Sequence, residues 1–369
     1  MARKKKINSR NIQSQVKKAY KKNPKMVVTL FILMILLFVG SFIYLYSGGY
    51  LDRFLNNTTS QVTTTPVVGT FEQDENGFYY YSSTGYESGS YYYNAKNLSG
   101  ETLVEQLQMI IKDGFTPVSY GDARYVLSFS DRDPETNYES VRGMYDNDVI
   151  ATEWIGTGED AWQREHVWPN SKLGIPRVNN SSKNQGSDLH NLRAITIINQ
   201  TRSNRYFAEG SGIATTIGSE GFYPGDEHKG DVARILFYMD IMYDELNLTN
   251  DITMLENNPG TNYTLEGAYA GILNLLLQWH KEDPVDEFEL QRNEFIYSGI
   301  ALDPDGKEIS PQGNRNPFID KPEYVHLIWE EKEIDDLLKI EVLSTVDYFP
   351  IEDLYYFIQS RRNDWITSC

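Results

Sequence analysis

An uncharged apolar segment over residues 26–46, "MVVTLFILMILLFVGSFIYLY", constrains this chain more than any other stretch. A helix of that length rises about 1.5 Å per residue and crosses the hydrocarbon core of a bilayer, which is about 30 Å thick. Ten Lys and Arg residues and no Asp or Glu lie within residues 1–50. The positive-inside rule therefore predicts a single-pass membrane protein, with a basic cytoplasmic tail over 1–25, a transmembrane anchor over 26–46 and the rest outside the cell.

Secretion after cleavage is the alternative to a retained anchor. The apolar core of a signal peptide usually has about 7–15 residues. The segment here is longer, and no A-x-A site follows it. We therefore favour the anchor, which makes the lipid bilayer a partner of residues 26–46, and we expect no protein partner.

Composition separates a stem from a folded domain. Residues 51–77 are rich in Asn, Thr, Ser and Gln, which is typical of a flexible linker. We expect a stem over 47–89 and a domain over 90–369. Ten of the 34 Lys and Arg residues precede residue 51, so the remainder holds 24 basic and 52 acidic residues. A protein with this excess of negative charge is not expected to attract nucleic acid by its net charge. The only cysteine, Cys369, excludes an intrachain disulfide and a Cys-based zinc site.

Apolar periodicity predicts several helices in the domain. The clearest ones are expected over 99–114, 120–129, 231–246 and 265–283, and another is expected from about residue 195. Asp305-Gly306 predicts the turn of a hairpin within 298–311.

Acidic residues alternate over 131–142, "DRDPETNYESVR", as they do in a calcium loop. Thr136 and Arg142 stand where an EF-hand needs Gly and Glu. We therefore expect a solvated acidic turn there and no calcium site.

Two stretches carry groups suited to phosphodiester hydrolysis. The first is "WQREHVWPNSKLG" (162–174), which reads as a strand running into a turn and would turn Glu165 and His166 to opposite faces. The second is "SDLHNLRAITIINQTRSNRYF" (187–207). Hydrolysis needs a base for the attacking water and a cation for the charge on the leaving oxygen. A neutral imidazole near its usual pKa of about 6.5 can act as that base, and carboxylate and amide oxygens suit Mg²⁺ or Ca²⁺.

The chain resembles the endonuclease I family of ββα-metal (His-Me finger) nucleases. The resemblance rests on "REHVWP", "SDLHNLR", "NQTRSN" and "QGNRNPFIDKPEY" (312–324), in that order, and it covers roughly residues 90–330 with a motif core over 160–325. It implies an α+β fold, in which a ββα-metal finger is embedded in a mostly helical domain. With the apolar segment, the expected fold class also includes one preceding transmembrane helix.

The resemblance also implies roles for individual residues. His166 would be the general base, and Glu165 and Asn199 would hold one divalent ion, Mg²⁺ by preference with Ca²⁺ or Mn²⁺ as alternatives. The family has an arginine that stabilises the scissile phosphate. Arg177 and Arg202 are the candidates for this role, with Arg164 a further alternative. Other candidate phosphate contacts are Arg205, Asn314 and Arg315.

Each of these residues also has a purely structural interpretation. His166 could be a buried histidine that donates to a backbone carbonyl, Glu165 could pair with Arg164, and Asn199 could bond locally. The "GNRNPF" segment could be a turn packed under the site. The grouping of Glu-His with a downstream Asn-x-x-Arg favours catalysis.

The resulting prediction is a membrane-anchored extracellular, non-specific endonuclease. It would hydrolyse DNA, with RNA as a further substrate, and leave 5′-phosphate ends. The alternative is a nuclease-like surface protein that binds metal or a partner and does not cut.

Overall fold

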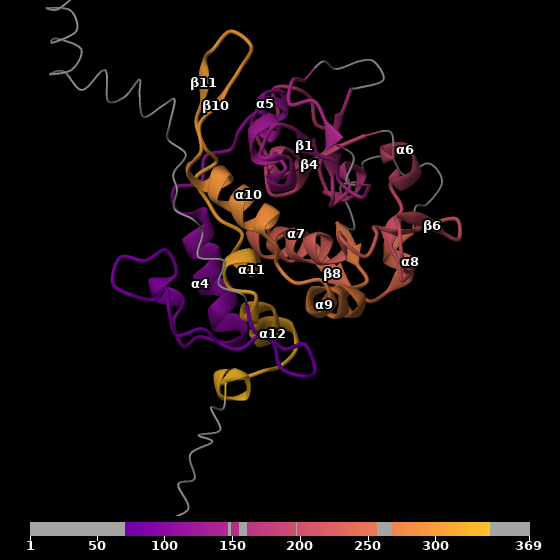
Figure 1. Ribbon diagram of the computed structural model, residues 1–369. Coiled ribbons are helices and arrows are strands. Elements are labelled where there is room, and N and C mark those ends of the chain that lie inside the picture. Colours follow the sequence, from indigo (N-terminus) through magenta and orange to yellow (C-terminus); the bar gives the residue numbers. More distant parts are fainter. Residues whose placement is uncertain (1–70, 147–148, 155–160, 197, 257–267, 340–369) are drawn as a thin grey trace, which may run out of the picture. The chain divides into compact units, whose positions relative to one another are not determined.

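The computed structural model describes residues 71–146, 149–154, 161–196, 198–256 and 268–339, which belong to one compact unit, Gly69–Cys369 (Figure 1). The described fold is α+β, with helices and short strands. The helices are α4 (Gly100–Lys112), α5 (Tyr120–Ser130), α6 (Asn199–Arg202), α7 (Lys229–Met242), α8 (Ile252–Leu255), α9 (Leu273–Glu282), α10 (Glu287–Ser298), α11 (Pro317–Asp320) and α12 (Glu323–Trp329).

The described strands form small separate sheets. Antiparallel pairs are made by β1 (Val141–Arg142) with β2 (Val149–Ile150), β3 (Gln163–His166) with β4 (Leu192–Ile195), and β10 (Ala301–Leu302) with β11 (Glu308–Ile309). In the three-stranded sheet, β7 (Gly221–Tyr223) lies between β5 (Tyr206–Phe207) and β6 (Thr215–Ile217), and β8 (Asn247–Thr249) pairs in parallel with β9 (Tyr269–Gly271).

Helix α7 lies at the centre of the core. Nearly all of its residues are buried, and it packs against α9, α4 and α11 (Figure 1). A helix that is apolar on most sides has to be covered on most sides. The strand pair β3–β4, which carries the Glu165-His166 dipeptide, lies beside α5.

The expected fold class has to be corrected in one respect, because it included a transmembrane helix. No helix among the described residues is both long and apolar enough to span a bilayer. The expected tail over 1–25 and anchor over 26–46 lie outside the described residues.

Most of the expected helices are present. Helices α4, α5 and α7 match the ranges 99–114, 120–129 and 231–246, and β10–β11 form the expected hairpin, with Gly306 at a positive φ of 79°. The range 265–283 is only partly helical, because β9 precedes α9. The helix expected from residue 195 is wrong in its start: β4 continues to Ile195, and α6 is a single turn that begins at Asn199.

Part of the expected stem packs into the domain. Tyr79 and Tyr86 are buried. The backbone N–H of Tyr79 donates to Nε2 of His326 at 3.0 Å, and the Tyr86 hydroxyl bonds that of Tyr324 at 2.7 Å. Residues 71–89 therefore belong to the folded unit, and the start of the stem lies outside the described residues.

The expectation of a solvated acidic turn over 131–142 is wrong. Asp131 is fully buried and contacts the guanidinium groups of Arg193 (3.3 Å) and Arg292 (2.8 Å). Asp133 is also buried and pairs with Arg142 at 2.8 Å. The alternating pattern does not reveal that Asp133 pairs with Arg142 inside the same stretch. Nor does it reveal the partners of Asp131, Arg193 and Arg292, which lie far along the chain.

Candidate active site

The β3–β4 pair holds Glu165 and His166 in a fixed register. Glu165 lies opposite Arg193, and His166 lies opposite Leu192. Because side chains alternate along a strand, Glu165 and His166 leave β3 on opposite faces, whereas Arg164 and His166 share one face. The neighbours in sequence therefore have different surroundings.

A cavity of about 520 Å³ opens beside this strand pair. It brings together three parts of the chain: the start of α5, β3 with the stretch after it, and α6 with the turn that follows. Its lining residues are Tyr120, Gln163, Arg164, Glu165, His166, Pro169, Asn170, Arg177, Val178, Gln200, Ser203 and Asn204. We call this the cleavage pocket.

His166 is held by two contacts. Its Nε2 lies 2.7 Å from the carbonyl oxygen of Gly186, and its ring stacks on that of Tyr120 with centroids 5.2 Å apart and an interplanar angle of 26°. A carbonyl oxygen only accepts, so Nε2 carries the proton and Nδ1 holds the lone pair. The tautomer is that of a base whose acceptor nitrogen is Nδ1.

Burial lowers the pKa of His166 to about 4; the Gly186 carbonyl opposes this shift, and the charge of Arg164 adds to it. The imidazole is therefore neutral at pH 7. The expectation of a pKa near 6.5 is wrong, because the surrounding protein disfavours the imidazolium form.

Glu165 is 5% exposed, and its Oε1 accepts a hydrogen bond from the hydroxyl of Tyr145 at 3.0 Å. Nε of Arg202 lies 3.7 Å from the same oxygen. Burial raises the pKa of Glu165 to about 7, and Arg202 and Tyr145 both oppose that rise. A buried carboxylate with this pKa gains from a nearby cation, which would favour its ionised form.

The donor set fits a hard divalent ion. Mg²⁺ needs one or two carboxylates and takes its other ligands from water and phosphate, and Glu165 lines the cleavage pocket. Among the described residues there is no group of three His, Cys, Asp or Glu side chains arranged around a metal position. Asn199 is the first residue of α6, and its side chain lies outside the described structure.

The candidate arginines differ in placement. Arg177 is exposed and lines the cleavage pocket. Arg164 also lines it, with its guanidinium 3.6 Å from the centroid of the Tyr120 ring and a hydrogen bond to the Tyr120 carbonyl. Arg202 is 0% exposed and donates to the carbonyls of Val167 and Ser203, both at 3.2 Å.

The other candidate phosphate contacts are not among the residues lining the pocket. Arg205 donates to the carbonyl of Thr201 at 2.8 Å. Asn314 is buried and donates to the Tyr238 hydroxyl at 2.7 Å. Arg315 forms ion pairs with Asp320 (2.7 Å) and Glu294 (2.5 Å). In this structure the "GNRNPF" segment is largely buried and leads into α11.

Two tyrosines at the site are not recognisable from the sequence. Tyr120 opens α5, where its N–H bonds the Ser182 carbonyl at 2.9 Å and fixes the ring beside the cleavage pocket. Tyr145 lies in the connection between β1 and β2 with a positive φ of 76°. The chain has 26 tyrosines, so neither stands out without the contacts that only the fold creates.

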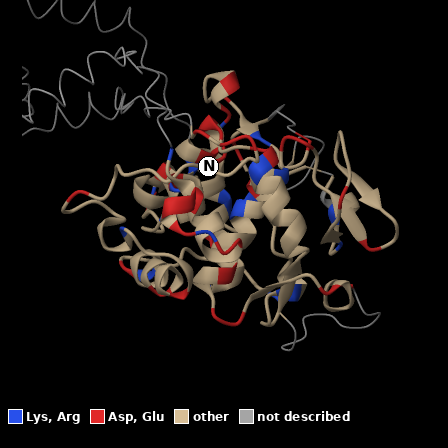
Figure 2. Cartoon of the chain, turned by 90° about the horizontal axis from the view of Figure 1, so that it is seen from below, with Lys and Arg blue, Asp and Glu red and all other residues tan. Residues whose placement is uncertain are grey.

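Some basic side chains near the site are engaged by other groups of the protein. Arg193 is buried between Asp131 and Asp231, and Lys172 donates to the carbonyl of Leu255. Basic and acidic residues are intermixed along the cartoon in Figure 2 rather than gathered in one block. Arg177 and Arg164 are the candidate arginines that line the pocket.

The chain is similar to known proteins over most of its described length. The chain matches the Endonuclease I family over residues 99–323, a range that contains the whole cleavage pocket. It is similar to the extracellular ribonuclease of Bacillus subtilis (strain 168), with 34% identity over 249 residues that cover 66% of this chain and 79% of the relative. Similarity to the extracellular ribonuclease of Bacillus amyloliquefaciens has the same extent and identity.

Proposed function

Because this chain belongs to the endonuclease I family and is a phosphodiester-hydrolysing nuclease, we propose that it acts outside the cell as a non-specific endonuclease on RNA and DNA. The names of the two Bacillus relatives support an extracellular location and RNA as a substrate. The sequence alone favoured DNA, and we keep DNA as a second substrate.

The observation that carries the proposal is the shared pocket of Glu165 and His166. A carboxylate suited to a cation and a neutral imidazole with a defined acceptor nitrogen are the two groups that hydrolysis needs, and both residues line this pocket. Their opposite directions from β3 let each face its own partner.

In this mechanism His166 removes the proton from the attacking water through Nδ1. With a pKa of about 4 the ring is neutral before the reaction, so it is ready to accept the proton. It becomes cationic only as charge builds on the phosphate, and that negative charge stabilises the imidazolium.

Members of the family generally depend on a divalent metal ion. We propose Mg²⁺, held by Glu165 and Asn199, with Ca²⁺ or Mn²⁺ as substitutes. When bound, such an ion neutralises charge on the phosphate and on the leaving oxygen. Departure of the 3′-oxygen gives 5′-phosphate products.

We propose different roles for Arg177 and Arg202. Arg177, exposed in the cleavage pocket, binds a phosphate oxygen of the substrate. Arg202 is buried against Oε1 of Glu165 and holds that carboxylate in its ionised form. Arg164, stacked on Tyr120, positions the ring against which His166 packs.

The test is cleavage of RNA and of single- and double-stranded DNA by the purified full chain with Mg²⁺. We expect cuts within all three substrates, 5′-phosphate ends, and complete loss of cutting with a chelator. Intact substrates under Mg²⁺, Mn²⁺ and Ca²⁺ would mean that the chain binds without cutting, and metal-independent cutting would contradict the mechanism.

Arg177→Ala tests the phosphate contact. We expect kcat/KM to fall roughly tenfold to a hundredfold, because a charge-assisted hydrogen bond is lost, and the salt dependence of cleavage to become shallower. Lys307→Ala removes an equally exposed positive charge from the β10–β11 turn and is the matched control. Equal effects of the two variants would contradict a contact between Arg177 and a substrate phosphate.

A further inference from the structure

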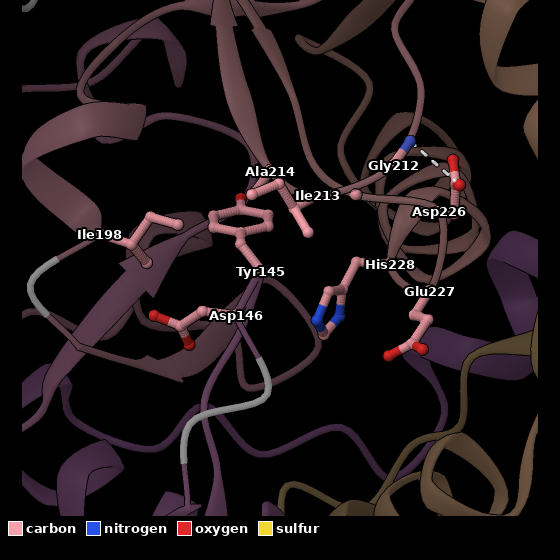
Figure 3. A pocket seen from close by; sticks show the side chains of 10 residues that line it. Tyr145, Asp146, Ile198, Gly212, Ile213, Ala214, Asp226, Glu227 and His228 are labelled. Carbon is pink, nitrogen blue, oxygen red and sulfur yellow. Dashed lines mark hydrogen bonds between the residues drawn. The ribbon is translucent and has the colours of Figure 1, made fainter.

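A second cavity, drawn in Figure 3, has a volume of about 490 Å³. It forms where the β1–β2 connection, the residue before α6, the segment before β6 and the start of α7 meet. Tyr145, Asp146, Ile198, Ile213, Glu227 and His228 are among its lining residues. We call it the His228 pocket.

The two pockets share a wall. Tyr145 lines the His228 pocket, and its hydroxyl donates to Glu165, which lines the cleavage pocket. Ile198 lines the His228 pocket and is bonded directly to Asn199, the first residue of α6. The two cavities are therefore neighbours, joined by the Tyr145–Glu165 hydrogen bond.

His228 is the group in this cavity that most needs a partner. It is 3% exposed, and neither Nδ1 nor Nε2 has a hydrogen-bond partner within the described residues. Its ring packs edge-on to Tyr145 with centroids 6.2 Å apart, and in Figure 3 it faces the space between Asp146 and Glu227. Buried polar atoms are almost always satisfied, so two orphan ring nitrogens point to a ligand.

The walls restrict what that ligand is. Carboxylates of Asp146 and Glu227 line the cavity, so they repel a phosphate and attract N–H donors. Ile213 is 86% exposed and, with Ile198, offers apolar surface to a flat ring. The described residues contain no three-ligand metal arrangement. A planar ring with several N–H donors and an acceptor matches this lining.

We propose that the His228 pocket binds a guanine base of the strand held in the cleavage pocket, an inference that rests on the proposed nuclease function. Guanine N1–H and its exocyclic amino group donate to the carboxylates, and O6 or N7 accepts from the His228 N–H. Uracil lacks the amino group, and adenine presents an acceptor at N1 to the carboxylate. The nuclease would therefore require no fixed sequence but would cut most often beside guanine.

Cleavage maps test this preference. The full chain is given single-stranded RNA oligomers that carry uracil throughout except for one guanine, inosine, adenine or uracil at a fixed place. We expect cuts beside guanine to exceed those beside uracil about tenfold, and inosine, which lacks the amino group, to lose much of that gain. A uniform map across the four oligomers would overturn the proposal.

Exposed residues supply variants that keep the fold. Glu227→Gln is expected to reduce the guanine-to-uracil cleavage ratio several-fold, whereas Glu245→Gln, a matched exposed glutamate on the far side of α7, leaves the ratio unchanged. An unchanged ratio in Glu227→Gln would contradict the assigned contact.

Binding can be measured without cleavage. The chain has five histidines, so the ring nitrogens of His228 are resolvable by ¹⁵N NMR. Guanosine added without metal should shift the His228 signals, and uridine should not. His228 signals that do not shift with guanosine would contradict guanine binding in the His228 pocket. If guanosine binds but the chain cuts no substrate, only the proposed nuclease function is contradicted.

Discussion

In the proposed mechanism Glu165 and His166 perform separate tasks, because β3 turns them toward different partners. The carboxylate faces Tyr145 and Arg202, and the imidazole faces Tyr120 and the Gly186 carbonyl. Tyr145 and Arg202 fix the orientation of the Glu165 carboxylate, and the Gly186 carbonyl fixes the tautomer of the His166 ring. Partners that do not touch the substrate should therefore still affect metal binding.

Tyr145→Phe tests that dependence at the residue scale. The change removes the hydroxyl that donates to Oε1 of Glu165 and keeps the ring in the core. Loss of an outer contact to a ligand typically costs about tenfold to a hundredfold in metal affinity, so calorimetry should show weaker Mg²⁺ binding. Tyr297→Phe, on the exposed side of α10, should leave it unchanged. Equal affinities in the two variants would contradict the positioning role.

At the scale of elements, helix α12 holds the N-terminal described segment in place. Its first residue, Glu323, accepts a hydrogen bond from the Ser82 N–H at 3.1 Å, and its His326 accepts one from the Tyr79 N–H. Burial raises the pKa of Glu323 to about 7. The carboxyl group is therefore protonated in the folded protein at pH values where it ionises in the unfolded chain.

This raised pKa predicts the pH dependence of Glu323→Gln. A raised pKa contributes stability that is complete below about pH 4.5 and is lost as pH rises through 7. Relative to the wild type, the variant should gain stability between pH 5 and 8, by at most about 3 kcal/mol. Urea unfolding at both pH values measures this, with exposed Glu308→Gln as the control. A difference that does not change with pH would exclude a buried, protonated Glu323.

Elements with a local signal could be predicted from the sequence, whereas those defined by pairing could not. Helix α4 has an apolar stripe of Leu103, Leu107 and Ile111, all buried, so its period alone reveals it. Strand β4, "LRAI", is buried at every position and has no alternation. Its pairing with β3, 26 residues or more away, decides its conformation, which is why a helix was expected too early there.

For the site, the motif identified the groups that we propose react, but not the residues that hold them. Glu165, His166 and Arg177 were found from the sequence and line one pocket. Arg202 was expected to reach phosphate, yet it is buried against Glu165 and backbone carbonyls. The burial of Arg202 depends on backbone carbonyls that come close to it only in the folded chain, so the sequence alone does not reveal it.

At the scale of the whole molecule, buried ion pairs join distant segments beneath the site. Asp131, at the end of α5, contacts Arg193 of β4 and Arg292 of α10, and its Oδ2 also accepts from the Ala194 N–H at 2.8 Å. Such a network stabilises little overall but costs much when one partner is lost. The strand that carries Glu165 pairs directly with β4, so the network supports the site.

Asp131→Asn should therefore destabilise the fold strongly. Removing the negative charge leaves Arg292 buried without its carboxylate, and breaking a buried pair costs about 3–5 kcal/mol. Asp305→Asn in the exposed β10–β11 turn should change stability by less than about 0.5 kcal/mol. Denaturant unfolding of both variants measures the difference, and equal stabilities would show that the network carries no such energy.

The most direct test separates metal binding from proton transfer in matched samples of the full chain. Calorimetry with Mg²⁺ and single-turnover cleavage of one RNA are measured for the wild type, Glu165→Gln and His166→Ala. We predict that Glu165→Gln loses Mg²⁺ affinity about tenfold or more, while His166→Ala keeps it and loses cleavage roughly 10²–10⁴-fold. Near wild-type cleavage by His166→Ala, or unchanged Mg²⁺ affinity in Glu165→Gln, would contradict the division of roles between these two neighbours.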